Sequence, residues 1–379
     1  MKRRREAFHD DEKESRLIPE IPTTVLTTHL LPFLDRKTWN NLSMASRELR
    51  EVTSSLVPPW PTKISLGPGV LLHSLLFSPD GNHIVCSTKI GTVYVLHQRT
   101  GFLAVLDVQH DDFEAADVKS QYSCCYSSNG QLMACSLLGK HPIRLWSNGF
   151  TRKRTFHEYG EHIMAYTICC DDRCLASVDR TGRIWFWQIE DGTLTRTIRI
   201  SDHKLFAAEF APGGTALVFS DRSGILRLFN LKSSFESTSR LVELGPAKRG
   251  HHKLAFSTDG QLLIMYRPYS DSTFDIWNLS QSKMHPRVLR RNEKAIFSLA
   301  FWPGGRHVAI GCASGHIQLW NLTEDKCDDF IDFENMDLEI DDAITRLAVS
   351  PDGRTIAAAG LADVAGRIRF WYSRAKMGA

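Results

Sequence analysis

The chain has 379 residues, of which 42% are hydrophobic and 23% charged, and its formal net charge is +3. So small a charge argues against nucleic-acid binding, and no apolar run approaches the roughly 18 residues of a membrane-spanning helix. The basic start at Lys2 leads into acidic residues instead of an apolar segment, so we expect no secretory signal.

The first 57 residues predict a tail followed by helices. Residues 1–16 are rich in charge, and only Phe8 could anchor them, so we expect this tail to be disordered. In residues 17–57 the apolar positions, among them Leu26 and Leu30, follow a helical period. We expect two or three short helices there, too few to bury a large core by themselves.

From residue 74 to residue 372 one pattern occurs seven times. An apolar strand, a polar turn with Gly and a second apolar strand are followed by an aromatic residue or Leu at the end of a third. The apolar residues alternate in twos, which is typical of strands. The spacing between successive copies is close to the ~40–45 residues that a four-stranded propeller blade contains. The repeated position is occupied by Leu96, Trp146, Trp187, Phe229, Trp277, Trp320 and Trp371.

The seventh repeat ends near Ser373, which leaves too few residues for the outer strand of its blade. Residues 62–66 have a strand pattern and no partner of their own. We predict that this segment pairs with the seventh blade as its outer strand, because a closed ring has no exposed edge there. Residues 60–379 would then form one closed, seven-bladed β-propeller.

The repeats resemble those of the WD-repeat β-propeller family over roughly residues 60–373. They depart from the family pattern, since none contains the Trp-Asp dipeptide. The family's aspartate before the third strand is matched by Asp179 and Asp221, and its Gly-His pair by Gly250 and His251. The resemblance implies an all-β, seven-bladed fold whose internal His-Asp-Trp hydrogen-bond network is incomplete in several blades.

The helical segment resembles the F-box, a module that docks substrate receptors onto the adaptor of cullin-type ubiquitin ligases. Thr23 and Thr24 stand where the family has an acidic pair, and the interval from Val25 to Asp35, which contains Pro32, is one residue longer than usual. A helical pair that merely packs on the underside of the propeller would give the same pattern. The resemblance implies adaptor contacts through Ile21, Pro22, Leu26, Leu30, Phe33 and Leu34.

No pattern of a catalytic, cofactor or metal site is present. The chain contains no Gly-x-Ser-x-Gly, no Gly-rich phosphate loop and no His-Glu-x-x-His. Cys170 and Cys174 have no second pair of ligands, so zinc is not expected. The innermost strands, to judge from residues 74–77, 299–301 and 347–349, are expected to carry packing residues.

The nine cysteines lie in or beside predicted strands. Their odd number and this placement favour reduced thiols over a disulfide framework. We therefore expect the protein to reside in the cytoplasm, the nucleus or both.

Charge is unevenly distributed among the loops that join consecutive blades on one face. We predict a basic sector near residues 248–294 and an acidic arc from 324–342 to 111–117. Such a face could steer a client protein of opposite charge, although solvated loops alone would give the same pattern. The client-binding residues we predict are Lys248, Arg249, Arg290, Arg291, Asp337, Glu339, Asp341 and Asp342.

Two functions fit these features, and neither needs catalysis or a cofactor. In the first, the chain is a substrate receptor of a cullin-type ubiquitin ligase: the F-box docks the adaptor and the propeller binds an unknown protein client. In the second, it is a WD-repeat scaffold unrelated to ubiquitin ligases, with its N-terminal helices packed on the propeller. Both make it a protein-interaction module that binds neither nucleic acid nor membranes.

Overall fold

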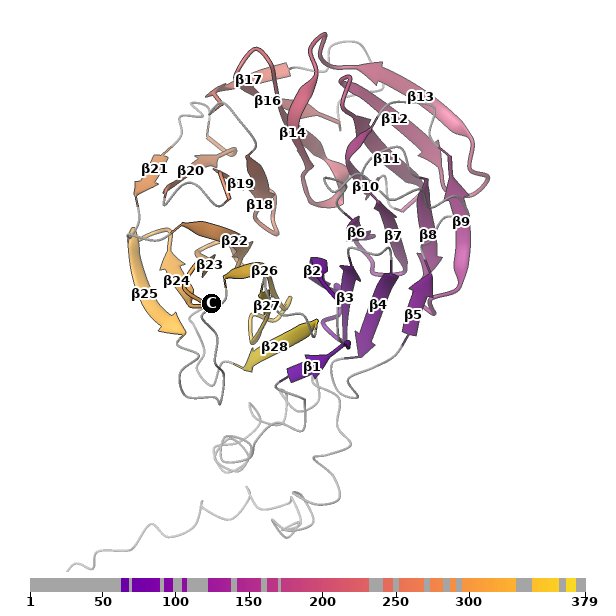
Figure 1. Cartoon of the computed structure of the whole chain (residues 1–379). Coiled ribbons are helices and arrows are strands. Elements are labelled where there is room, and N and C mark those ends of the chain that lie inside the picture. The colour runs from indigo at the N-terminus through magenta and orange to yellow at the C-terminus, as the bar shows by residue number, and fades with distance from the viewer. Residues whose placement is uncertain are drawn as a thin grey trace, which may run out of the picture. The chain divides into compact units, whose positions relative to one another are not determined.

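The computed structural model describes most of the repeat region. The described residues are 63–67, 70–88, 92–97, 104–107, 122–137, 142–157, 162–169, 172–231, 241–247, 252–268, 273–281, 287–290, 295–331, 343–360 and 366–372. All of them belong to one compact unit, Trp60–Ala379. They form seven four-stranded antiparallel sheets arranged in a ring (Figure 1). The predicted seven-bladed all-β propeller is confirmed, whereas the predicted tail and F-box-like helices lie outside the described residues.

Each sheet is one blade, and its strands follow one another outward from the axis. Blade 1 contains β2 (Leu72–Phe77), β3 (His83–Thr88), β4 (Thr92–His97) and β5 (Ala104–Asp107). Blade 2 contains β6 (Tyr122–Tyr126), β7 (Leu132–Leu137), β8 (Ile143–Ser147) and β9 (Arg152–Phe156). Blade 3 contains β10 (Ile163–Cys169), β11 (Cys174–Asp179), β12 (Arg183–Gln188) and β13 (Leu194–Arg199).

The next three blades have the same order. Blade 4 contains β14 (Leu205–Phe210), β15 (Ala216–Asp221), β16 (Ile225–Asn230) and β17 (Leu241–Pro246), with a short 3-10 helix at Pro212–Gly214. Blade 5 contains β18 (Lys253–Phe256), β19 (Leu262–Tyr266), β20 (Thr273–Asn278) and β21 (Arg287–Arg290). Blade 6 contains β22 (Ile296–Phe301), β23 (His307–Cys312), β24 (Ile317–Asn321) and β25 (Lys326–Ile331).

Blade 7 contains β26 (Ile344–Val349), β27 (Thr355–Gly360), β28 (Arg367–Tyr372) and, as its outer strand, β1 (Lys63–Ser65). The pairing of β1 with β28 is antiparallel, with Ile64 opposite Ile368. Beyond the strand, the amide of Leu66 donates a hydrogen bond to the carbonyl of Gly366 at 3.3 Å. The pairing predicted for residues 62–66 is therefore confirmed over Lys63–Ser65.

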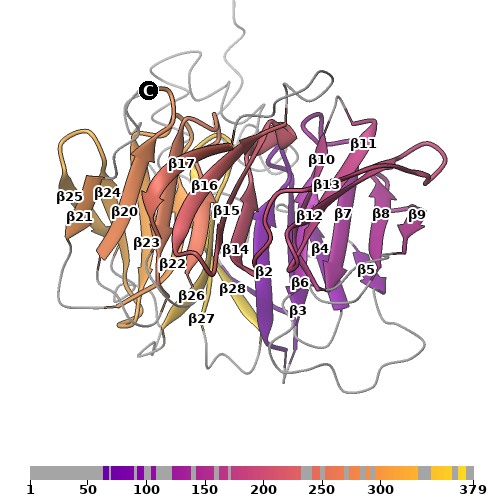
Figure 2. The same ribbon diagram turned by 90° about the horizontal axis from the view of Figure 1, so that it is seen from above.

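The first strands of the blades contact one another in a closed ring that runs from β2 through β6, β10, β14, β18, β22 and β26 back to β2. These strands therefore surround the axis, and the outer strands lie at the rim, as Figure 1 shows face-on. Figure 2 shows the same ring edge-on, with the outer strands β25 and β9 at its two sides. Residues on the first strands are consequently the ones that can face the axis.

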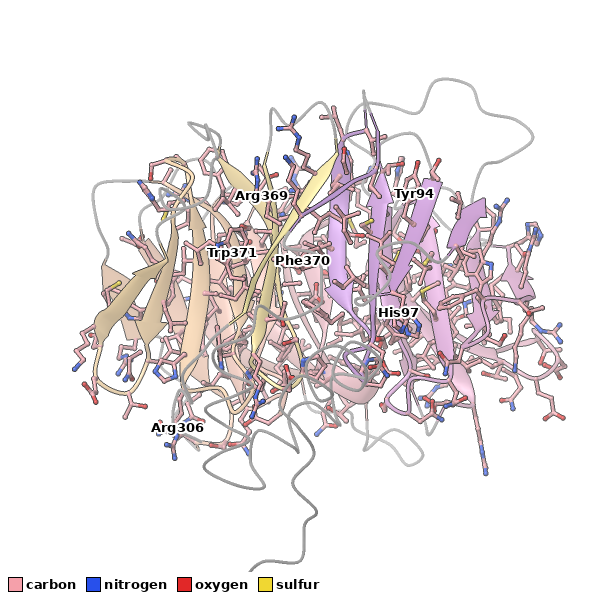
Figure 3. All side chains as sticks on the ribbon, turned by 90° about the horizontal axis from the view of Figure 1, so that it is seen from below. Tyr94, His97, Arg306, Arg369, Phe370 and Trp371 are labelled. Atoms are coloured by element: carbon pink, nitrogen blue, oxygen red, sulfur yellow. The ribbon has the colours of Figure 1, made fainter. Side chains whose placement is uncertain are left out.

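The hydrophobic core is divided into clusters between neighbouring blades. At the closure, Ile368 and Phe370 of β28 pack with the first strands of blade 1, and Ile64, Leu66 and Tyr94 pack against that cluster. Figure 3 labels Phe370 on β28 and Tyr94 on the adjoining blade 1. The side chains of the closing strand and its neighbours thus join the two ends of the ring through apolar contact.

Candidate interaction face

The site residues predicted from the sequence are almost all outside the described part of the chain. This applies to Ile21, Pro22, Leu26, Leu30, Phe33 and Leu34, and to Lys248, Arg249, Arg291, Asp337, Glu339, Asp341 and Asp342. Arg290 ends β21, and only its backbone is described. These sites therefore stay predictions.

Asp179 and Asp221 occupy equivalent positions, where the second strands of blades 3 and 4 turn into the third. Their exposed fractions are 2% and 1%. Oδ1 of Asp179 accepts hydrogen bonds from the amides of Thr181 (2.8 Å) and Arg183 (3.0 Å), and Oδ2 accepts one from Nε1 of Trp185 (3.1 Å). The two aspartates matched to the family pattern thus hold their turns through buried hydrogen bonds.

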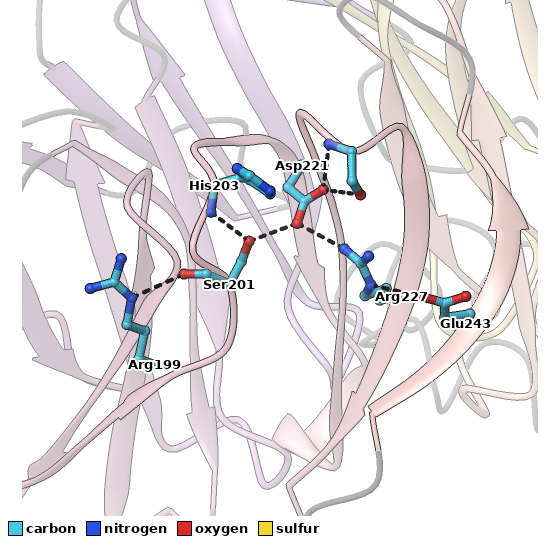
Figure 4. Close-up of polar contacts among 7 residues, drawn as sticks. Arg199, Ser201, His203, Asp221, Arg227 and Glu243 are labelled. Carbon is cyan, nitrogen blue, oxygen red and sulfur yellow. Dashed lines mark hydrogen bonds and ion pairs between the residues drawn. The ribbon is translucent and has the colours of Figure 1, made fainter.

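Asp221 additionally ties two blades together, as Figure 4 shows. Its Oδ2 accepts a hydrogen bond from Ser201 Oγ (2.6 Å), which lies on the loop that leaves blade 3. The same oxygen lies 2.8 Å from Nη1 of Arg227, whose Nε is 3.5 Å from Oε1 of Glu243. The loop after blade 3 and the turn of blade 4 are therefore fixed next to each other.

Burial raises the pKa of Asp221, but hydrogen bonds from Ser201 and Ser223 and the charge of Arg227 outweigh burial and hold the pKa below its ordinary value. The carboxylate is therefore ionised at neutral pH. Because the folded pKa lies below the unfolded one, Asp221 contributes stability at neutral pH, and this contribution is lost as the pH falls through the folded pKa.

We call the face that carries the turns 180–182 and 222–224 and the loop 200–204 the upper face. Arg180, Arg183, Arg199 and Arg222 are exposed on it, and together we call them the arginine sector. The backbone of Arg180 is fixed by two 2.8 Å hydrogen bonds, one from its amide to the carbonyl of His162 and one from the amide of Leu205 to its carbonyl. The sector therefore stands on rigid backbone.

The positive charge of the arginine sector is poorly neutralised. Arg183 and Arg199 face each other directly across β12 and β13, an arrangement of like charges that destabilises a strand pair. Arg199 has an acidic partner, Asp202, at 3.2 Å. Within the described residues, Arg180, Arg183 and Arg222 form no side-chain ion pair.

His252, the residue after the predicted Gly-His pair, is buried and hydrogen-bonded. His252 has an exposed fraction of 6%, and its Nε2 lies 2.8 Å from Oγ of Ser220 on β15. His251, which the sequence pairs with Gly250, lies outside the described residues. The buried hydrogen bond identifies His252 as the histidine that links the start of blade 5 to blade 4.

The apolar residues of stretches 74–77, 299–301 and 347–349 pack in the core clusters as expected, but three of the first strands also carry a charged residue. Glu209 on β14, Lys253 on β18 and Arg346 on β26 are charged residues of first strands. The prediction was drawn from the apolar stretches of β2, β22 and β26, and the last of these begins one residue after Arg346. A single charged residue that interrupts an apolar strand was the signal available in the sequence.

Two kinds of site are not found in the described part of the chain. Its histidine, cysteine and acidic side chains form no group of three that could hold a metal ion. Across the same residues, no helix has the length and apolar character needed to cross a bilayer.

Comparisons with known proteins agree with the fold. The model of the family "WD domain, G-beta repeat" matches residues 285–321. The chain is 24% identical over 192 residues to "Target of rapamycin complex subunit LST8" of Bos taurus, covering 51% of this chain and 56% of that protein. It is 25% identical over 262 residues to "Periodic tryptophan protein 2" of Arabidopsis thaliana, covering 67% of this chain and 27% of that protein.

A chain in the "Crystal Structure of Mitotic Checkpoint Complex" has a similar fold, with a TM-score of 0.61, 15% identity, and coverage of 83% of this chain and 93% of that one. The chain spans only about half the length of the LST8 relative that it matches. The seven sheets, the matched repeat and this structural likeness agree on one architecture. The chain is therefore a seven-bladed β-propeller, and residues 285–321 within it match the WD40 repeat.

Proposed function

We propose that this chain is a non-catalytic scaffold that binds partner proteins, and that the arginine sector of its upper face contacts an acidic segment of one of them. The matched repeat supports an interaction role. The relative in cattle is, by its name, a subunit of a target of rapamycin complex, which also favours a role in an assembly. Non-catalytic action, and residence in the cytoplasm or nucleus, remain proposals that rest on the sequence.

The observation that carries the proposal is the exposed positive charge of Arg180, Arg183 and Arg222, which no described side chain neutralises. Exposed arginines on fixed backbone can form paired hydrogen bonds with carboxylates and lose little freedom when they do so. Complementary charge also accelerates encounter with the correct partner. The basic sector predicted at residues 248–294 would add further positive charge to that of the arginine sector.

The double variant Arg180→Glu, Arg222→Glu tests the upper face. In quantitative affinity purification, we expect this variant to retain about tenfold less partner protein than the wild-type chain, or less still. The reason is that attraction becomes repulsion at two positions. A matched control reverses the charges of Arg173 and Arg306 by the same substitution to Glu. Both are exposed arginines on turns between first and second strands (Figure 3 labels Arg306). Equal retention by the two double variants would contradict the proposal.

The ubiquitin-ligase receptor is the finer possibility, and it depends on residues outside the described part of the chain. The matched family and relatives support the repeat propeller and lend no support to the F-box resemblance. If the F-box is present, the chain would accelerate ubiquitin transfer by holding client and ligase together.

A pull-down with the purified cullin adaptor tests the F-box. Under the receptor hypothesis, wild-type chain binds the adaptor and Leu30→Asp abolishes binding, because a charge would enter an apolar contact. The matched control is Lys63→Asp, an exposed position on β1. If the wild-type chain does not bind the adaptor, the scaffold is the one function of the two that remains.

A further inference from the structure

Three charged side chains project from the innermost ring of strands. Lys253 and Arg346 each stand three residues before the apolar residue that ends the strand, Phe256 on β18 and Val349 on β26. They therefore occupy the same level of the ring, on the two sides of β22. Glu209 lies one residue before the end of β14, two positions further along the strand direction.

Arg346 is held in place by main-chain acceptors. Its Nη1 donates a hydrogen bond to the carbonyl of Thr345 at 2.7 Å, and its Nε donates one to the carbonyl of His73 on the next strand of the ring. A β-bulge between Ile344 and Arg346 allows this orientation, since a bulge redirects the side chain that follows it. A guanidinium has five N–H donors, so several remain for a ligand.

Lys253 and Glu209 lack comparable partners. Among the described residues, neither side chain takes part in a hydrogen bond or in an ion pair within 4.0 Å. Lys253 is half-buried. Glu209 keeps contact with solvent, but the ring of first strands around it makes ionisation of its carboxyl more costly than in open water. An ammonium group that is partly removed from water and has no acceptor is a costly arrangement, and an anionic ligand would relieve it.

The pKa values reflect the same arrangement. Burial and, to a smaller extent, the charge of Arg346 lower the pKa of Lys253, Glu209 only partly offsets them, and the resulting pKa is about 8. Burial raises the pKa of Glu209 to about 7, against the attraction of Lys253. The two cations are thus within electrostatic range of each other, and the carboxylate does not neutralise them.

We propose that Lys253 and Arg346 bind one oxyanion, a carboxylate, phosphate or sulfate group, at the axis of the propeller, and that ionised Glu209 weakens this binding by repulsion. The positions equivalent to Glu209 in blades 5 and 6 are Ala255 and Ala300, so their side chains contribute only methyl groups beside the site. This anion site needs no partner protein, so it can be tested separately from the upper-face interaction.

The proposal has a defined pH dependence. Affinity falls as the pH rises through about 8, where Lys253 loses its proton, and it rises as the pH falls through about 7, where Glu209 gains one. Of the groups on neighbouring strands, Cys125 and Tyr166 have raised pKa values, the first about 12, and stay neutral throughout. His73 is the titratable residue on the strand beside Arg346, and its main-chain carbonyl accepts the Arg346 hydrogen bond.

Sulfate is the suitable probe, because it remains divalent from pH 6 to pH 9 while phosphate titrates. We expect calorimetric titration of the full chain, at constant ionic strength in chloride, to give one sulfate site whose affinity decreases from pH 6 to pH 9. Lys253→Met should lower the affinity at pH 7 about tenfold, the value of one charge-assisted hydrogen bond. Glu209→Gln should raise the affinity at pH 8.

Lys63→Met and Glu190→Gln make the same charge changes at exposed positions away from the first strands and should leave sulfate binding unchanged. The opposite signs expected for Lys253→Met and Glu209→Gln distinguish a site from a general loss of folding. The proposal is overturned if the wild-type chain binds no sulfate, if Lys253→Met and Lys63→Met behave alike, or if Glu209→Gln weakens binding.

The source of the natural oxyanion is decided by competition. Short peptides that carry one glutamate or one phosphoserine are titrated with and without saturating sulfate. Displacement of such a peptide by sulfate assigns the site to a partner's side chain, whereas sulfate binding without peptide binding assigns it to a free anion. Arg180→Glu, Arg222→Glu should retain the sulfate site, so failure of the upper-face proposal would leave this one intact.

Discussion

Replacing Asp179 by alanine is expected to lower the free energy of unfolding by about 3–5 kcal/mol, because the buried donors around it would lose their acceptor together. These donors are the amides of Thr181 and Arg183, the hydroxyl of Thr181 and the indole of Trp185. Urea denaturation followed by tryptophan fluorescence measures the loss. The variant should also loosen the turn that carries Arg180.

Asp179→Asn should cost less than Asp179→Ala. The amide keeps one oxygen for the Thr181 and Arg183 donors, and its NH₂ group faces the indole N–H of Trp185. Asp202→Ala is the matched control, since this aspartate makes only an exposed ion pair with Arg199 and should change stability little. Equal stability of Asp179→Ala and Asp202→Ala would show that the buried carboxylate does not hold the turn.

Deletion of residues 60–66 is expected to lower the melting temperature by at least about 5 °C and to promote aggregation. The deletion removes β1 and its hydrogen bonds to β28, together with the packing of Ile64 and Leu66 against the cluster that contains Ile368. It also leaves the edge of β28 unpaired. Differential scanning calorimetry measures the first effect and light scattering the second.

The substitutions Lys63→Ala and Ser65→Ala provide the control for this deletion. Both side chains are exposed, and both residues keep their backbone pairing with Arg369 and Arg367. Their melting temperature should therefore stay close to that of the wild-type chain. If the deletion variant has the same melting temperature as these two substitution variants, β1 contributes nothing to closure.

The fold was predictable from the sequence because each blade repeats the same requirement. Its inner positions are apolar in twos, and its last buried strand ends in a large residue such as Trp277, which is fully buried and donates a hydrogen bond from Nε1 to the carbonyl of Leu244 on blade 4. The closing strand was predictable for a related reason. Blade 7 lacked an outer strand, and only residues 62–66 offered one.

The charged residues at the axis were not predicted, because strand periodicity does not distinguish the inner end of a blade from its outer parts. Glu209 precedes Phe210 in an apolar strand, and Lys253 stands at a strand start where a solvated residue is ordinary. Only the ring contacts between first strands bring these residues into the range of Arg346.

The histidine register and the arginine sector needed the three-dimensional structure for similar reasons. The sequence matched His251 to the Gly-His pattern, whereas the hydrogen bond between His252 and Ser220 on the neighbouring blade follows only from the structure. Arg183 and Arg199 are separated in sequence, so their direct opposition follows only from the pairing of β12 with β13. The predicted loops at residues 248–294 and 324–342 remain hypotheses for the solution experiments.

Closure by β1 sets the order of events during synthesis. The segment Lys63–Ser65 leaves the ribosome about 300 residues before its partner β28, an interval of roughly 15–60 s at ordinary rates of translation. Blades 1 to 6 contain all their own strands and can form during that interval, whereas β1 must wait for β28. A nascent chain interrupted before β28 would retain an unpaired β1 and an open ring, which is a feature that chaperones and proteases recognise.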